Sequence, residues 1–347
     1  MKRLLSLALI GILMISLTAC KSSEEELAAL YYSSDNVVNT DIGEYIIGQT
    51  APLFTEGKLC YVTEAEQFVD ENLSCKAAIV INVTDNEFVQ GQDIFKQVYP
   101  ASITKLMTAY IVMEYGNLDD EYTIKEDNCG ITESGAQLIG FKKGDVVKVR
   151  DLLYCLLMYS GNDAGTALAE YMSGDEASFS LFMNEELKKL GCNSTNFTNG
   201  HGLHNENHYT SAYDVYIVLN KCMEYDIFKE ICQTMDYEFS HLNAQGEYTN
   251  VSFSTTNRFK LGLYPTPEGI TILGGKTGNT YAAGSCLVQY ISDTNGKEYI
   301  VGIFGAENTD SLYTQMTYLM NSISSANGNN VQTGDVNDSE SGESTAE

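Results

Sequence analysis

The sequence predicts an α+β fold, in which an antiparallel sheet is built from both chain ends and a helical lobe is inserted between them. Residues 77–83 form a β-branched run that ends in a turn and resumes at 87–90, as in a hairpin. Helical patterns then dominate from about residue 102 to 225, and strands return after Thr256. Pairing the early hairpin with the late strands gives a sheet with simple connections.

The individual elements follow from periodicity and from stop signals. The run at 151–159 (DLLYCLLMY) is apolar nearly all round, which indicates a helix buried inside the domain. Ser211 and Asp214 provide a capping-box start for another helix. Expected helices cover 102–115, 151–159, 164–172, 175–190, 211–225 and 310–322; expected late strands cover 270–273, 286–291 and 299–304, with a hairpin turn at 293–296.

The N-terminus predicts an export signal with a lipid attachment site. Lys2 and Arg3 precede an apolar run of about 14 residues, shorter than the roughly 20 that a spanning helix needs. The run ends in LTAC at 17–20, which resembles the bacterial lipobox. We therefore expect residues 1–19 to be a signal peptide and Cys20 to carry the lipid that anchors the protein to the outer face of the bacterial cytoplasmic membrane. An uncleaved membrane anchor is the alternative.

Composition divides the rest of the chain into three parts. Residues 20–52 predict a flexible tether, 53–323 one folded domain, and 324–347 a disordered, polar and acidic tail. The formal net charge of −27 argues against nucleic acid as a partner, because phosphate contacts need clusters of lysine and arginine.

Nine cysteines in an exported chain raise the question of disulfides. Cys155 and Cys286 lie in strongly apolar stretches, which favours buried thiols. Two pairings stay open, namely Cys60 with Cys75 and Cys222 with Cys232. The chain has no C-x-x-C motif, and the histidines at 201, 204 and 208 have no obvious acidic or thiolate companion. We expect no metal site and no cofactor.

Three short motifs can carry chemistry: Ser102-x-x-Lys105, Ser160-Gly161-Asn162 and Lys276-Thr277-Gly278. Ser102 and Lys105 share one face of a helix, so the amine can reach the hydroxyl. The amine can act as a base only if burial and a neighbouring cation disfavour its charged form, and Lys276 is a candidate for that cation. The positive end of the helix dipole at Ser102 suits a developing oxyanion.

The other two motifs would complete such a site. A polar break at residues 160–162 inside a buried helix predicts a cavity, where Ser160 could relay a proton and Asn162 could hold a substrate carbonyl or Lys105. Lys276, Thr277 and Gly278 suit a carboxylate receptor that a substrate backbone can approach closely. The backbone N–H groups of Ser102 and Asn279 are candidates for an oxyanion hole. Each motif alone is common in turns of helices or hairpins.

With their flanking residues, the motifs resemble those of the serine D-alanyl-D-alanine carboxypeptidases, which are low-molecular-mass penicillin-binding proteins. The resemblance covers about residues 77–322. It includes YPASITKLMT at 99–108, SGNDA at 160–164, NFTNGHGL at 196–203, TNR at 256–258 and GKTGNTYAAG at 275–284. Gly200 departs from the proline usual before His-Gly-Leu, and Asn279 stands where many members have another residue.

The resemblance implies a β-lactamase/transpeptidase-like fold and a serine D,D-peptidase catalytic domain at 53–323. It implies removal of the terminal D-alanine from peptidoglycan stem pentapeptides through an acyl-enzyme on Ser102, with β-lactam antibiotics as acylating inhibitors. The implied roles are a base at Lys105, assistance from Ser160 and Asn162, and a carboxylate receptor at Lys276 and Thr277.

Three alternatives remain at this stage. A D,D-endopeptidase that cuts cross-links would use the same residues. A class A β-lactamase needs a second carboxylate on a loop after the middle motif, and residues 193–203 contain no glutamate. A non-catalytic wall-binding lipoprotein is disfavoured because all three motifs are intact.

Overall fold

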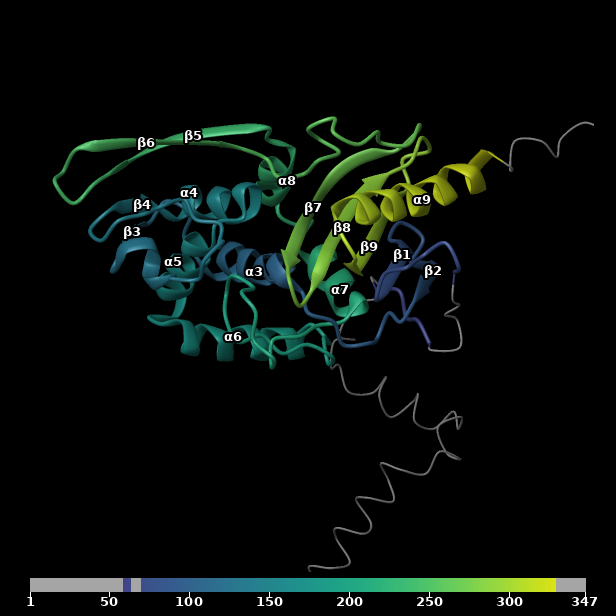
Figure 1. Ribbon diagram of the computed structural model, residues 1–347, viewed down its shortest axis with the longest axis horizontal. Helices are drawn as coiled ribbons and strands as arrows, with labels where there is room; N and C mark the ends of the chain where they lie inside the picture. The colour runs from purple at the N-terminus through teal and green to yellow at the C-terminus, as the bar shows by residue number, and fades with distance from the viewer. Residues whose placement is uncertain (1–58, 64–69, 329–347) are drawn as a thin grey trace, which may run out of the picture. The chain divides into compact units, whose positions relative to one another are not determined.

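The structure, a computed structural model, describes residues 59–63 and 70–328, with side chains as far as Ile323 (Figure 1). The expected signal peptide, Cys20, the tether at 20–52 and the tail beyond Gly328 lie outside these residues. Within the described part of the chain, no helix is both long and apolar enough to cross a membrane.

A five-stranded antiparallel sheet joins the two ends of the folded segment, which confirms the predicted architecture. The strand order is β2-β1-β9-β8-β7. Its strands are β1 (Ala77–Asn82), β2 (Glu87–Gln92), β7 (Thr271–Thr280), β8 (Gly284–Ser292) and β9 (Glu298–Ala306). The early strand β1 pairs directly with the last strand β9. Strand β7 is an edge strand, and this edge faces the helical lobe.

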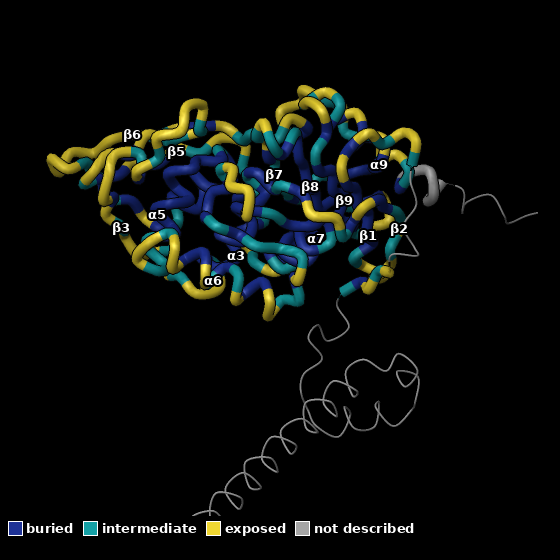
Figure 2. The backbone as a smooth tube through the Cα atoms, turned by 60° about the horizontal axis from the view of Figure 1, so that its bottom comes forward, coloured by how far each residue is buried: buried dark blue, intermediate teal, exposed yellow. Residues whose placement is uncertain are grey.

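Both faces of the sheet are covered by helices, so the central strands are apolar on both sides. All six residues of β1 are buried, with Ile79 and Ile81 in one core cluster and Val80 in the other. Helix α9 (Thr309–Gly328) packs on the second face through Met316 and its neighbours, while α7 (Ala212–Cys222) lies on the first (Figure 1). Figure 2 shows β8 and β9 deeply buried.

The inserted helical lobe surrounds a central buried helix, α3, which carries Lys105. The lobe and its flanking turns comprise the 3₁₀ turn η2 (Ala101–Thr104), α3 (Lys105–Tyr115), the 3₁₀ turn η3 (Asp127–Gly130), α4 (Val149–Tyr154), the π-turn η4 (Cys155–Tyr159), α5 (Asn162–Ser173), α6 (Glu176–Lys189), α7 and α8 (Asp226–Gln233). Ser211 caps α7 by accepting a hydrogen bond from the backbone N–H of Asp214, as the sequence predicts.

A second, four-stranded sheet lies beside the lobe and was not expected from the sequence. Its order is β3-β4-β5-β6, with β3 (Glu121–Thr123), β4 (Val146–Lys148), β5 (Asp236–Leu242) and β6 (Tyr248–Ser254). Stacked rings of Tyr154 and Tyr237, 3.7 Å apart, fix β5 against α4. The far end of the β5–β6 hairpin is exposed (Figure 2).

Several expected boundaries are wrong. The helix expected over 211–225 ends at Cys222, and a separate helix, α8, follows it. Helix α9 runs through residues 324–328, which were assigned to the disordered tail, because no helix breaker occurs before Gly328. Cys75, Cys222 and Cys232 carry free thiols, so neither open disulfide pairing forms.

Hydroxyl groups of tyrosine satisfy many carboxylates in this acidic chain. With 47 acidic and 20 basic residues, cations are too few to pair with each carboxylate. Tyrosine fills part of the gap because its O–H can donate to a carboxylate oxygen. Such pairs are Tyr115–Glu186, Tyr154–Glu230, Tyr171–Asp120, Tyr237–Asp151, Tyr290–Glu298 and Tyr318–Asp70.

Candidate active site

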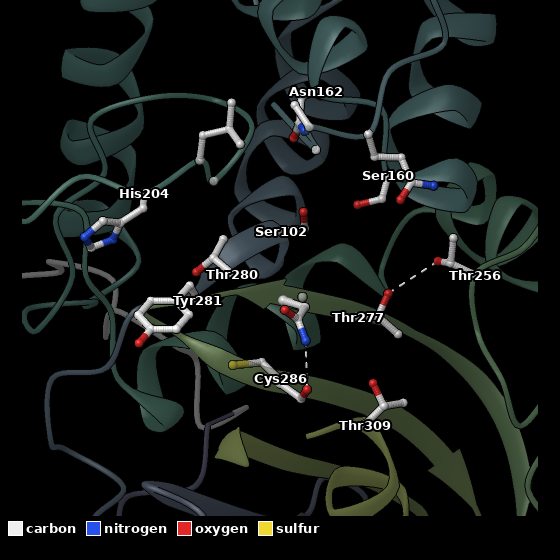
Figure 3. A pocket seen from close by; sticks show the side chains of 18 of the residues that line it. Ser102, Ser160, Asn162, His204, Thr256, Thr277, Thr280, Tyr281, Cys286 and Thr309 are labelled. Atoms are coloured by element: carbon white, nitrogen blue, oxygen red, sulfur yellow. Dashed lines mark hydrogen bonds between the residues drawn. The ribbon is translucent and has the colours of Figure 1, made fainter. Parts of the chain in front are cut away.

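The three motifs meet in one cleft between the edge of β7 and the helical lobe (Figure 3). Ser102 lies half-buried in the turn η2, directly before α3. Ala101 holds a left-handed backbone with φ of +50°, which is costly for a non-glycine residue. Gly202 packs so closely that an added Cβ would lie 2.0 Å from the carbonyl oxygen of Ala101. Only glycine fits at 202, and its approach helps to hold the serine turn.

Lys105 makes three short polar contacts, which a neutral amine can satisfy as well as an ammonium group. Its Nζ lies 2.9 Å from Oγ of Ser102, 2.8 Å from Oδ1 of Asn162 and 2.5 Å from the carbonyl oxygen of His201. A neutral amine has two N–H donors and one lone pair. It can donate to Asn162 and His201, which only accept, and take a hydrogen bond from the serine hydroxyl.

The surroundings disfavour charge on this amine. Lys105 is fully buried, and desolvation is the main reason that its pKa lies well below the usual 10.5. The charge of Lys276 lowers the pKa further, whereas Asp163 opposes the shift. The side chain of Asp163 accepts hydrogen bonds from the backbone N–H groups of Ile139 (3.0 Å) and Gly140 (2.8 Å) instead of contacting the amine.

Lys276 and Ser160 form the second half of the site. Nζ of Lys276 donates to Oγ of Ser160 at 3.0 Å and to the carbonyl oxygen of Thr277 at 2.9 Å. Ser160 has a left-handed backbone, with φ of +68°, where the π-turn η4 ends and α5 begins. Lys276 is 2% exposed, and burial lowers its pKa to about 7. At neutral pH, whether Lys276 carries a charge therefore depends on what binds beside it. The sequence did not indicate this.

The Lys276–Gly278 motif lies inside β7, not after the end of a strand as the sequence suggested. Glycines allow the strand to pass close to the serine turn, since an added Cβ on Gly278 would lie 3.1 Å from the backbone nitrogen of Ser102. This contact brings the backbone of β7 beside that of Ser102. Asn279 follows in the same strand, and its side chain donates to Oγ of Ser285 at 2.8 Å.

The cleft has a volume of about 720 Å³ and includes residues outside the three motifs. Thr256 contributes Oγ1 at 3.3 Å from Oγ1 of Thr277 (Figure 3). Arg258 and a loop at 133–137 also line the cleft. The backbone N–H of Asn162 binds the carbonyl oxygen of Gln137 at 2.8 Å and ties this loop to the lobe. Among these residues, the sequence pointed only to Thr256 and Arg258, through the TNR string at 256–258.

The three histidines at 201–208 have different surroundings. His201 is buried, with Nε2 2.9 Å from the carboxylate of Glu176, while its carbonyl holds Lys105. His208 is also buried, and its Nε2 lies 2.7 Å from Oγ1 of Thr104. His204 lines the cleft. Two of the three imidazoles therefore support the loop around the cleft.

Fold and site together define a class, the serine acyl-transfer enzymes of the β-lactamase/transpeptidase-like fold. Comparison with known proteins places the chain more narrowly. Residues 62–308 match the peptidase S11 family of D-alanyl-D-alanine carboxypeptidases, and the chain belongs to this family.

Individual relatives support this placement. The chain is 29% identical to the D-alanyl-D-alanine carboxypeptidase DacF of Bacillus subtilis over 248 residues, which cover 71% of this chain and 61% of DacF. It is 30% identical to DacC of Escherichia coli over 257 residues, covering 72% of this chain and 60% of DacC. The chain thus spans about 60% of the length of these relatives.

Solved structures show the same fold. The DD-transpeptidase of Streptomyces strain K15 superposes with a TM-score of 0.66 at 25% identity, covering 73% of this chain and 98% of that enzyme. The carboxypeptidase DacD of Francisella tularensis superposes with a TM-score of 0.62 at 24% identity, covering 74% of this chain and 71% of DacD.

The two lysines predict a bell-shaped pH profile for acylation by benzylpenicillin, which carries a carboxylate. The rate should rise with pH as Lys105 loses its proton. It should fall again near pH 7 and above, because Lys276, with a pKa of about 7, loses the charge that attracts the carboxylate. Lys276→Arg keeps its charge at all these pH values, so the falling limb should move to higher pH while the rising limb stays.

Lys105→Arg serves as the matched variant for this profile. It keeps a cation that cannot deprotonate, so acylation should fall by about 10²–10⁴-fold at every pH. Near-normal acylation of Lys105→Arg, or a falling limb that is unchanged in Lys276→Arg, would contradict these assignments.

Proposed function

We propose that this protein is a serine D-alanyl-D-alanine carboxypeptidase, which removes the terminal D-alanine from peptidoglycan stem pentapeptides. The observation that carries the proposal is the 2.9 Å contact between Nζ of Lys105 and Oγ of Ser102, in surroundings that lower the pKa of the amine. Membership of the peptidase S11 family supports the choice of substrate.

In the proposed reaction, Lys105 takes the proton of Ser102 as Oγ attacks the carbonyl carbon of the penultimate D-alanine. The backbone N–H groups of Ser102 and Asn279 stabilise the oxyanion. Ser160 donates a proton to the leaving amine, and its contact with Lys276 provides a route to replace that proton. Water then attacks the acyl carbon and gives a proton back to the Ser160–Lys276 pair, while Lys105 returns its proton to Oγ of Ser102 as the shortened peptide leaves.

The terminal carboxylate of the substrate binds at the end of the cleft formed by Lys276, Thr277 and Thr256. Two hydroxyls and an ammonium group can surround a carboxylate with charge-assisted hydrogen bonds. Binding of the carboxylate favours the charged form of Lys276, whose pKa is about 7 in the free protein. Recognition of the substrate and protonation of Lys276 are therefore linked.

A direct test uses a stem pentapeptide and cross-linked muropeptides as substrates, with mass spectrometry of the products. We expect loss of one D-alanine from the pentapeptide, and no reaction with Ser102→Ala. Cleavage of cross-links in preference to the pentapeptide would instead assign a D,D-endopeptidase.

The same protein with labelled penicillin separates a carboxypeptidase from a β-lactamase. No glutamate occurs at 193–203 to activate water, so the penicilloyl group should remain on Ser102 through many turnovers of peptide. Rapid hydrolysis of penicillin over many turnovers would assign a β-lactamase.

We further propose that the enzyme acts outside the cytoplasm, held to the outer face of the membrane by a lipid on Cys20. The LTAC sequence at 17–20 supports this proposal. Cys20→Ala should release the protein from the membrane fraction, because the acyl chains that insert into the bilayer would be missing. Intact mass of the membrane-bound wild-type protein is the check, and a mass that still includes Met1 would contradict the proposal.

A further inference from the structure

The catalytic cleft carries one group of each charge at its surface. Among the residues that line it, Glu133 provides one carboxylate and Arg258 one guanidinium group. Within the described part of the chain, the Glu133 carboxylate makes no hydrogen bond or ion pair. It is therefore available to a ligand, unlike the carboxylates of Asp163 and Glu176, which are used within the protein.

The backbone around Glu133 is held in place. The carbonyl oxygen of Glu133 accepts a hydrogen bond from the backbone N–H of Ala136 at 3.2 Å, which closes a turn. Directly after this turn, Gln137 is bonded to Asn162 of the catalytic motif. The loop that bears the carboxylate is thus attached to the same helix start that orients Lys105.

The charges give the cleft a direction. Lys276, Thr277 and Thr256 mark the end that takes the terminal carboxylate of the substrate. From Thr277 the strand β7 runs on to Thr280 and a fully exposed Tyr281, which lies on the same side of the cleft as His204 (Figure 3). The acyl part of the peptide, on the other side of the scissile bond, has the rest of the cleft available to it.

The chemical partner of an unpaired carboxylate in a peptide-binding cleft is an ammonium group, and the end that takes the terminal carboxylate already has the cation of Lys276. We propose that Glu133 is a specificity residue that binds a primary ammonium group on the side chain of the residue before the D-alanyl-D-alanine. The inference rests on the proposed carboxypeptidase function and names the peptides that this site prefers.

The consequence is selection between free and cross-linked stem peptides. Forming a cross-link through such a side chain converts its ammonium group into a neutral amide, which cannot form an ion pair with Glu133. The enzyme therefore favours peptides whose side-chain amine is still free. This selectivity comes from binding, so it acts on KM and leaves kcat nearly unchanged.

The test compares D-alanine release from Nα-acetyl-L-lysyl-D-alanyl-D-alanine and from its Nα,Nε-diacetyl form. In the wild-type enzyme, KM should be about 3- to 5-fold lower for the free amine, the size expected of a partly exposed ion pair. Glu133→Gln should abolish this difference without changing kcat for the diacetyl peptide. A general base would behave differently, because its loss lowers kcat for both peptides.

Glu206→Gln is the matched control. Glu206 is an exposed glutamate near His204 that does not line the cleft, so its removal changes the net charge equally. The preference should survive in Glu206→Gln and should shrink at high salt in the wild type. Equal loss in both variants, or retention in Glu133→Gln, would overturn the inference.

A second pair of ligands separates this inference from the proposed function. Ampicillin differs from benzylpenicillin by an ammonium group on its acyl side chain, and acylation of Ser102 requires no peptide turnover. The acylation rate with ampicillin divided by the rate with benzylpenicillin should fall in Glu133→Gln. The same ratio should stay constant in Glu206→Gln. If the wild-type enzyme cleaves neither peptide but Glu133→Gln still changes the ratio of β-lactam acylation rates, only the carboxypeptidase function is refuted. If Glu133→Gln leaves this ratio unchanged, the role of Glu133 is refuted.

Discussion

Two lysine amines share one buried cleft, and in the described part of the chain neither has a carboxylate in hydrogen-bonding contact. A buried ammonium group without a counter-ion is expensive, so burial lowers the pKa of both. The neighbours of Lys105 are the uncharged hydroxyl, amide and carbonyl groups of Ser102, Asn162 and His201, and none of them supplies a counter-ion. The other residues of the site keep the amine of Lys105 uncharged, next to the amine of Lys276, which can gain a proton.

The fold separates the two amines in sequence and joins them in space. Lys105 begins α3 in the core of the helical lobe, whereas Lys276 lies in an edge strand of the sheet. The sheet unites both ends of the folded segment, with β7 at one edge. The Asp163 carboxylate raises the pKa of Lys105, but it hydrogen-bonds to the backbone N–H groups of Ile139 and Gly140 and not to the amine. The Asp163 carboxylate therefore holds the 139–140 loop in place and forms no ion pair with Lys105.

The sequence was sufficient for the five-stranded sheet and for most of the helices, because apolar periodicity is strong there. It was insufficient for β5 and β6, although Tyr237, Phe239 and His241 alternate with polar residues, because these strands contain few strongly apolar residues. The three motifs named the reacting side chains. They could not indicate that the carbonyl oxygen of His201 contacts Lys105, because a backbone contact leaves no side-chain signature. They also could not place Glu133 in the cleft, because its loop lies outside every motif.

In the resting enzyme at neutral pH, we expect Lys105 to be an amine and not an ammonium ion. NMR of protein labelled with ¹⁵N at the lysine side chains, with Nζ of Lys105 assigned by its loss in Lys105→Arg, measures this directly. We expect this nitrogen to titrate far below the ordinary lysine range, because Lys105 is fully buried. A Lys105 nitrogen that stays protonated up to about pH 10, as in an exposed lysine, would contradict the account.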